Sequence, residues 1–172
     1  MTYNKKNYYD TNLMHLETLK KSAIAGFFSI FIIGTLTYLS YETEYGLFLV
    51  ASFGSSMVLI LGYPESQFAK GRNVFFGHII TSIAGLICYS ILVIHFSISV
   101  TAVIPISVGL GSFFMILLNS THPPAGGNPI LIILGGHSFD FLLSPLISGC
   151  IIIILQAYFI NHVILKRDFK LF

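Results

Sequence analysis

The sequence predicts an all-α, polytopic bundle of transmembrane helices, and three observations favour this fold class. Of the 172 residues, 55% are hydrophobic and 9% are charged, whereas soluble globular domains carry about 25% charged residues. The mean hydropathy is +0.83. The apolar residues form long runs separated by short polar loops, and about 20 apolar residues are enough to cross a bilayer core of roughly 30 Å. We therefore expect an integral membrane protein.

Three parts of the chain are expected. Residues 1–21 are predicted to be an N-terminal segment that is neither a secretory signal nor an organelle transit peptide, since they lack an apolar run and arginine. The charge distribution described below favours a cytoplasmic position for it. Residues 22–165 are predicted to form the transmembrane domain. Residues 166–172 form the predicted cytoplasmic C-terminal tail.

Four apolar runs each have a length close to that of a full membrane crossing. They cover residues 22–40, 46–62, 74–94 and 100–118. Glu42 and Glu44 mark a short acidic loop between the first two runs. Gly54 in the second run, and Gly109 and Gly111 in the fourth, are small enough to let another helix approach closely, either within the chain or between chains.

The fifth apolar run is short and the sixth is long. Residues 129–136 cover about half of a crossing, so the stretch 125–139 is either a short, thinned span or one half of a broken helix. The sixth span is predicted over residues 144–165. The number of crossings is therefore five or six.

The distribution of charge favours six crossings. With six, all nine Lys and Arg residues lie on one side of the membrane, and the acidic residues Glu42, Glu44 and Asp140 lie on the other. With five, the basic C-terminal residues move to the opposite face, which breaks the positive-inside rule. The prediction is therefore six membrane segments, with both termini cytoplasmic.

A weak internal repeat agrees with this topology. Gly54-Ser55 with Met57 resembles Gly111-Ser112 with Met115, and a proline-bearing loop follows each copy. The repeat unit is then one helical hairpin plus one loop, in tandem, although matches this short also arise by chance. The topology independently places both proline-bearing loops, at Pro64 and Pro123, on the cytoplasmic side, where they can converge on one site.

The most polar and most constrained run between two apolar segments is Asn119-Ser120-Thr121-His122-Pro123-Pro124-Ala125-Gly126-Gly127-Asn128-Pro129. Prolines fix φ and lack an N–H group, and glycines let the backbone approach itself or a ligand closely. Non-helical backbone at membrane depth survives only where protein buries it or where it lines a wet cavity. We therefore predict a substrate or ion site at this loop.

The chemistry of the loop suits an anion. If a helix begins after the break, Ser120 or Thr121 is its expected N-cap and Pro123 fits its first turn. The N–H groups of residues 125–127 then point out of the helix start, where a partial positive charge favours anions. Residues 70–73 give the start of the third span the same electropositive character. Neutral hydroxyl, amide and imidazole donors suit a small oxyanion that must also be released.

The candidate substrate-binding residues come from the second span, the start of the third span and the two loops. They are Ser55, Ser56, Glu65, Arg72, Asn73, His78, Asn119, Ser120, Thr121, His122, Pro123, Pro124, Gly126 and Asn128. His122 is either a pH-responsive donor or a helix cap. Glu65 is either a coupling-proton carrier or the partner of a salt bridge to Lys70 or Arg72. Arg72 either steers the anion or anchors the cytoplasmic face.

Enzymatic function is not expected. The sequence has no GxSxG, HExxH or CxxC motif and no glycine-rich phosphate loop. Cys88 and Cys150 lie in apolar runs, where a thiol usually packs as a small hydrophobe. We therefore expect no catalytic residue, no cofactor, no metal and no nucleic-acid partner.

A set of ordered motifs resembles the HPP family of integral membrane proteins over roughly residues 22–165. The motifs are Phe53-Gly54-Ser55-Ser56, Pro64-Glu65-Ser66, Arg72-Asn73-Val74, Gly77-His78 and Thr121-His122-Pro123-Pro124-Ala125-Gly126. The family is usually described with four spans, fewer than the charge argument gives. Some members resemble nitrite transporters of cyanobacterial and plastid membranes, so the resemblance implies nitrite transport. Without a plastid-type transit sequence, a prokaryotic cell membrane is a better expectation than the plastid envelope.

Two functions from different classes follow. The first is transport of a small monovalent oxyanion, nitrite first, through a site formed by the two loops, which then face water and each other. The second is a non-transporting membrane scaffold or regulatory subunit, whose loops form an outward docking surface. The expected partners are the anion, the lipid bilayer and further copies of the chain in a dimer or trimer.

Overall fold

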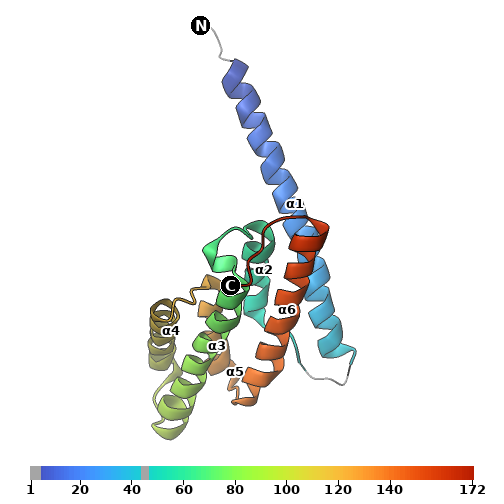
Figure 1. The fold of residues 1–172 in the computed structure, drawn as a ribbon. Helices are drawn as coiled ribbons and strands as arrows, with labels where there is room; N and C mark the ends of the chain where they lie inside the picture. The colour runs from blue at the N-terminus through green and yellow to red at the C-terminus, as the bar shows by residue number, and fades with distance from the viewer. Residues whose placement is uncertain (1–4, 44–46) are drawn as a thin grey trace.

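The computed structural model describes residues 5–43 and 47–172, with side chains from residue 14 onward. Within these residues the chain is 79% helical and contains no strand, so the predicted all-α class is confirmed. Figure 1 shows a bundle from which one end of the first helix projects. The α-helices are α1 Lys5–Tyr41, α2 Ala51–Gly62, α3 Gly71–Cys88, α4 Val100–Leu117, α5 Asn128–Gly135 and α6 Ser148–Tyr158.

Shorter helical segments extend or connect these helices. The 3₁₀-helices η1 (Gln67–Ala69) and η3 (Pro123–Gly127) lie in the two proline-bearing loops. The π-helical segment η2 (Tyr89–His95) prolongs α3, while η4 (Leu142–Ile147) and η5 (Phe159–Ile164) prolong α6 at its two ends.

Among the residues that the structure describes, four helical stretches are long and apolar enough to cross a membrane. They are Met14–Tyr41, Gly71–His95, Val100–Leu117 and Leu142–Ile164. The helices α2 and α5 have 12 and 8 residues, and at about 1.5 Å per residue neither reaches across a core of roughly 30 Å. The prediction of six full crossings is therefore not confirmed by the described part of the chain, nor is the tandem repeat. The helix lengths support the four-span alternative.

The predicted second span is helical only within α2. Glu44 and the predicted start of the span at Gly46 lie outside the described residues, and residues 47–50 are not helical, with Val50 extended. The N–H of Phe48 donates a hydrogen bond to the hydroxyl of Ser40 at 2.9 Å. The backbone of this stretch therefore bonds to a neighbouring segment instead of continuing the helix.

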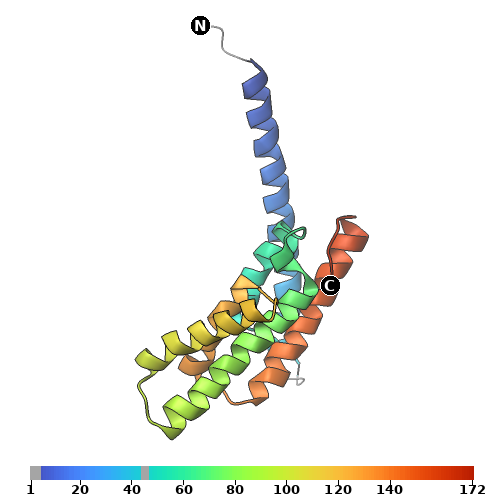
Figure 2. The ribbon, with the colours of Figure 1, turned by 60° about the vertical axis from the view of Figure 1, so that its left-hand side comes forward.

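The first helix is longer than the predicted first span. It extends from Lys5, ahead of the predicted start at residue 22, because no proline or glycine interrupts the sequence between these positions. Figures 1 and 2 both show its first turns standing clear of the other helices. The fourth span was predicted more closely, since α4 differs from the expected residues 100–118 by one residue.

The third helix lies at the centre of the packing, in contact with α4, α5, α6 and η3. A Cβ placed on Gly111 of α4 would lie 3.4 Å from Cα of Thr81 on α3, so the predicted close approach of helices occurs there. Gly54 and Gly109 face open space instead. An apolar core that includes the fully buried Phe53 joins α1, α2, α3 and α6.

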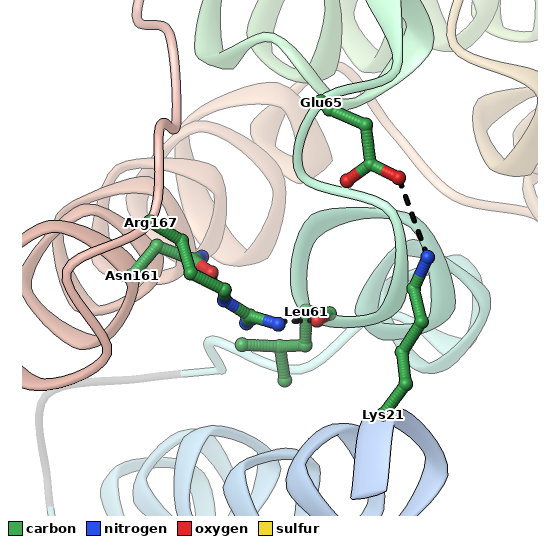
Figure 3. A network of polar contacts seen from close by, with 5 residues as sticks. All are labelled: Lys21, Leu61, Glu65, Asn161 and Arg167. Atoms are coloured by element: carbon green, nitrogen blue, oxygen red, sulfur yellow. Dashed lines mark hydrogen bonds and ion pairs between the residues drawn. The ribbon is translucent and has the colours of Figure 1, made fainter. Parts of the chain in front are cut away.

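Basic side chains lie around the loop that carries Glu65, at an end of the bundle that we call the basic end: Lys21, Lys70, Arg167 and Lys170. Figure 3 shows Lys21 and Arg167 there. Lys21 Nζ lies 3.3 Å from a carboxylate oxygen of Glu65 and 3.9 Å from the centre of the Tyr63 ring. The predicted salt bridge from Glu65 to Lys70 or Arg72 is therefore wrong, because α1 brings Lys21 to the loop. The gathering agrees with the charge separation that the sequence predicted.

The C-terminal tail covers the start of α3. The N–H of Gly71 donates to the carbonyl of Lys170 at 2.9 Å, and the N–H of Arg72 donates to the carbonyl of Leu171 at 2.7 Å. Phe169 is buried between these segments and the bundle. The tail therefore occupies two of the N–H groups that the sequence assigned to an electropositive mouth.

Candidate functional site

Six polar side chains are buried together between α2, α3 and the start of α5. We call them the central polar cluster: Ser52, Ser56, His78, Ser82, His122 and Asn128. All six are at most 9% exposed. Burying a polar group is costly unless it is hydrogen-bonded, so the pattern of bonds within the cluster decides what it can do.

His122 joins the two proline-bearing loops through its ring. Its Nδ1 lies 2.7 Å from the carbonyl oxygen of Phe68, and its Nε2 lies 2.8 Å from the hydroxyl of Ser56. A carbonyl can only accept, so Nδ1 carries the proton in this geometry. In the neutral ring, Nε2 then accepts the hydrogen bond from Ser56.

His78 has the opposite tautomer. Its Nε2 lies 3.1 Å from the Ser56 hydroxyl, which already donates to His122, so Nε2 of His78 must be the donor. Its Nδ1 lies 3.0 Å from Nδ2 of Asn128 and accepts from that amide. The centres of the two rings are 5.2 Å apart and their planes are tilted by 58°.

Asn128 completes the pattern at the first residue of α5. Its Nδ2 also lies 2.9 Å from the hydroxyl of Ser82 and 3.3 Å from the carbonyl of His78, so this atom is the amide nitrogen. Its Oδ1 accepts from Ser52 at 2.6 Å. The ring nitrogens and the Asn128 amide are thus all bonded while both histidines are neutral.

The local sequence explains how the loop reaches the cluster. His122 has extended dihedrals, φ −136° and ψ 94°, as expected for a residue before proline. It is the N-cap of η3, and its side chain makes no cap bond. The predicted N-cap at Ser120 or Thr121 is therefore wrong, although Pro123 does lie in the first turn.

Two further details of the predicted loop chemistry are corrected. The N–H of Ala125 is not free, since it donates to the carbonyl of His122 at 3.0 Å. The hydroxyl of Ser120 donates to the carbonyl of Leu118 instead of capping a helix. Space is open beside Gly126 and Gly127, so a close approach of the backbone to itself does not explain this glycine pair.

The surroundings of His122 and Glu65, one in each proline-bearing loop, determine how these two side chains ionise. Burial lowers the pKa of His122, which lies between α4 and α5, to about 4, although its bond to Phe68 opposes the shift. The pKa of Glu65 is lowered by a backbone hydrogen bond and by Lys21. Its side chain is 66% exposed, so Glu65 stays ionised near neutral pH, which argues against its predicted alternative role as a proton carrier.

The structure brings together only four of the candidate site residues: Ser56, His78, His122 and Asn128. Ser55 is exposed on another face of α2. The remaining candidates in the 119–126 loop are arranged around the cluster: Asn119 and Pro123 are exposed, Ser120 is buried, and Thr121, Pro124 and Gly126 are half-buried.

Arg72 and Asn73 bond to backbone carbonyls outside the cluster. Arg72 donates to the carbonyls of Asn119 at 2.8 Å and Leu118 at 3.4 Å, which end α4. Asn73 donates to the carbonyl of Gln67 at 2.8 Å. Cations at a helix C-terminus stabilise its free carbonyls, so the position of Arg72 is explained without a substrate.

Arg167 makes the equivalent contact at the end of α2. It donates to the carbonyl of Leu61 at 2.9 Å and to Oδ1 of Asn161 at 2.6 Å, as Figure 3 shows for the Leu61 contact. Asn161 in turn donates to the carbonyl of Ile60 at 2.9 Å. Both arginines of the sequence therefore stabilise helix ends.

Sequence reasoning missed Ser52 and Ser82. Each lies four residues from a candidate, Ser52 from Ser56 and Ser82 from His78, and residues spaced by four share one face of a helix. That spacing was the signal that could have found them. Among the described residues, no three His, Cys, Asp or Glu side chains gather as metal ligands.

Two pockets are lined by segments that adjoin residues of the cluster or their partners. One, of about 370 Å³, is lined by Val50, Ala51, Leu131 and Asp140 among others, and two of these residues immediately precede Ser52. The other, of about 220 Å³, lies at the basic end and includes Ser66, Gln67 and Lys70, next to Phe68. No residue of the central polar cluster itself lines either pocket.

Comparison with known proteins supplies the family. The chain matches the HPP transmembrane region over residues 12–170. It is 27% identical over 161 residues to each of two curated transmembrane proteins of Dictyostelium discoideum, covering 91% of this chain and 56% and 51% of theirs. The chain therefore spans about half the length of these relatives. No solved structure matches it. Since the match covers nearly the whole sequence, the chain belongs to the HPP family of transmembrane proteins.

Proposed function

We propose that this protein transports a small monovalent anion across the membrane. The observation that supports this most directly is the meeting of two short helices at the central polar cluster. The hydroxyl of Ser52, in the first turn of α2, is 2.6 Å from the side chain of Asn128, the first residue of α5. Broken helices whose N-termini point at one site are a common way of binding an anion inside a membrane protein.

The neutrality of the cluster fits a transported ligand. Polar groups inside a membrane are costly and usually mark a substrate pathway. His78, His122 and Asn128 bond to one another and to serine hydroxyls and backbone carbonyls without a permanent charge, so an anion that replaces one of these bonds can also leave. Access to the cluster would have to open from the two pockets, whose linings adjoin Ser52 and Phe68 in the sequence.

Nitrite is the first substrate to test. This choice rests on the resemblance of the sequence motifs to nitrite transporters, and the chemistry of the cluster fits any small oxyanion. We place the protein in the cell membrane with its basic end, and therefore both termini, in the cytoplasm. The open faces at Gly54 and Gly109 are where a second copy would pack in a dimer or trimer.

The alternative, a scaffold with outward docking loops, has less support. Its loops should project from the bundle, whereas His122 is fully buried and bonded to Phe68 of the other loop. The hydrogen-bonded cluster would then serve only to fix the helices.

Uptake by proteoliposomes distinguishes the two functions. Purified protein is tested with nitrite, nitrate, formate and chloride at two pH values, together with His122→Ala and Arg72→Ala. Transport predicts nitrite-selective uptake that falls strongly in His122→Ala, while Arg72→Ala keeps the selectivity because Arg72 contacts only helix-ending carbonyls. Folded wild-type protein that moves none of these anions faster than empty liposomes would overturn the proposal.

A further inference from the structure

We infer that His122 takes up a proton at Nε2 together with the transported anion, and that rotation of the Ser56 hydroxyl allows this protonation. This inference rests on the proposed transport function and names the ion that accompanies the substrate. The observation behind it is that the hydroxyl of Ser56 has two hydrogen-bond acceptors within reach but only one hydrogen to donate.

The hydroxyl of Ser56 has two acceptors within reach. Nε2 of His122 lies at 2.8 Å, and the carbonyl of Ser52 lies one helical turn back at 3.2 Å. A hydroxyl has one hydrogen, so it can donate to only one of them at a time. In the neutral cluster it donates to His122 while its oxygen accepts from His78.

Protonation needs no movement of any heavy atom. The incoming proton forms an N–H bond with the lone pair on Nε2 of His122, and no other covalent bond breaks. The Ser56 hydroxyl rotates to donate to the carbonyl of Ser52, which frees an oxygen lone pair to accept from the new N–H. The oxygen then accepts from both His122 and His78, which is within the capacity of a hydroxyl.

His78 is excluded as the proton acceptor. Its Nδ1 already faces the N–H of Asn128, and the Asn128 amide is held in that orientation by the carbonyl of His78 and by Ser82. A proton on Nδ1 would therefore face another proton. The cluster offers one site of protonation, on His122.

The proton and the anion stabilise each other. The titratable group that faces His122 is His78; Arg72 is turned to the end of α4 and Glu65 to Lys21. No carboxylate among the described residues is bonded to either ring to balance an imidazolium charge. A buried charge is costly alone and much less so beside an opposite charge, so each ligand raises the affinity for the other by the same factor.

Proton movement during nitrite uptake tests the inference. Proteoliposomes that contain a pH dye should acidify inside as nitrite enters. Ser56→Ala removes the acceptor for the new N–H and should lower this nitrite-linked proton uptake by about tenfold or more. Ser56→Thr, which keeps the hydroxyl, and Ser55→Ala, on the exposed neighbour, should retain it. Nitrite uptake without acidification in the wild type would overturn the inference and leave the transport function standing.

The tautomers give a readout that does not depend on transport. Nitrogen NMR of ¹⁵N-histidine-labelled protein should show His122 protonated at Nδ1 and His78 at Nε2, and added nitrite should move the protonation midpoint of His122 to higher pH. Protonation of neutral His122 at Nε2, or a midpoint that nitrite does not move, would overturn the inference. Loss of all anion uptake in the wild type would instead overturn the transport function itself.

Discussion

A Cβ atom placed on Gly77 would lie 2.8 Å from Cβ of His122 and 3.0 Å from the carbonyl oxygen of Ser120. Real Cβ atoms essentially never approach another atom as closely as the first of these distances. The central loop can therefore rest on α3 only because this position carries no side chain. The hydrogen bonds of His122 to Ser56 and Phe68 depend on this close packing.

Gly77→Ala should displace the loop. We expect a loss of about 1–3 kcal/mol of stability, as for other overpacked sites, and weaker anion uptake because His122 moves away from Ser56. Thermal unfolding in detergent measures the stability. Gly34→Ala is the matched control, since Gly34 faces open space in α1, and it should leave the melting temperature unchanged or slightly higher. Equal effects of the two substitutions would contradict the packing argument.

Asn128→Ala should destabilise the cluster by about 1–3 kcal/mol, because Ser52, His78 and Ser82 each lose a buried hydrogen-bond partner. Thermal unfolding checks this as well. Asn119→Gly serves as the control: Asn119 is exposed and has a φ of 50°, which glycine adopts without strain. A melting temperature for Asn128→Ala within error of the control would be inconsistent with the bonding pattern.

Acid should destabilise the anion-free protein through His122. Its pKa of about 4 in the folded state is below the value near 6.5 of an unfolded chain, so the unfolded state binds more protons between these values. Stability is therefore full above pH 6.5 and falls as the pH drops toward 4, by up to roughly 3 kcal/mol at about 1.4 kcal/mol per pH unit.

The measurement is the unfolding midpoint between pH 7.5 and 4.5. His122→Ala should show a shallower pH dependence than the wild type, while His162→Ala, which removes an exposed histidine, should keep the wild-type slope. Identical slopes for His122→Ala and the wild type would remove His122 as the responsible group.

Arg72→Ala should lower stability by about 1–2 kcal/mol, because the two carbonyls that end α4 lose a charged donor. Arg72→Lys should recover part of the loss, since an ammonium lacks the planar fork of a guanidinium. Lys70→Ala provides the control. If Arg72 instead steers the anion, Arg72→Ala would leave the melting temperature unchanged and raise the KM for uptake in a salt-dependent way.

Single-cysteine labelling tests the sidedness. With Cys88 and Cys150 replaced by alanine, Glu65→Cys and Asp140→Cys place one thiol at each end of the bundle. A membrane-impermeant maleimide should label the Asp140→Cys protein from outside intact cells, and the Glu65→Cys protein only after the membrane is opened. Labelling of both from outside would contradict the proposed topology.

Several features followed from the sequence because they depend on composition or on local rules. Low charge and long apolar runs are sufficient for the all-α membrane class. The bounds of α4 follow from one apolar run, and the extended conformation of His122 follows from Pro123. The positions of charged residues predicted the basic end, where Lys21 meets Glu65.

Which residues form the site could not be predicted from the sequence, because this depends on how the helices are rotated and on which backbone groups need a hydrogen-bond partner. Ser55 and Ser56 are adjacent in a run of small residues, and no local signal tells which one faces α3. Arg72 looks like a ligand for an anion until the free carbonyls at the end of α4 are placed beside it. The predicted second span is longer than α2 because the non-helical residues 47–50 are as apolar as a membrane helix.

The contact of the C-terminal tail with α3 has a consequence for biosynthesis. The N–H groups of Gly71 and Arg72 bond to carbonyls of residues 170 and 171, so this end of α3 stays open to water while the ribosome makes α4, α5 and α6. The start of α3 is thus covered only after residues 170 and 171 have been made. Nascent chains arrested before residue 169 should therefore remain accessible at Gly71.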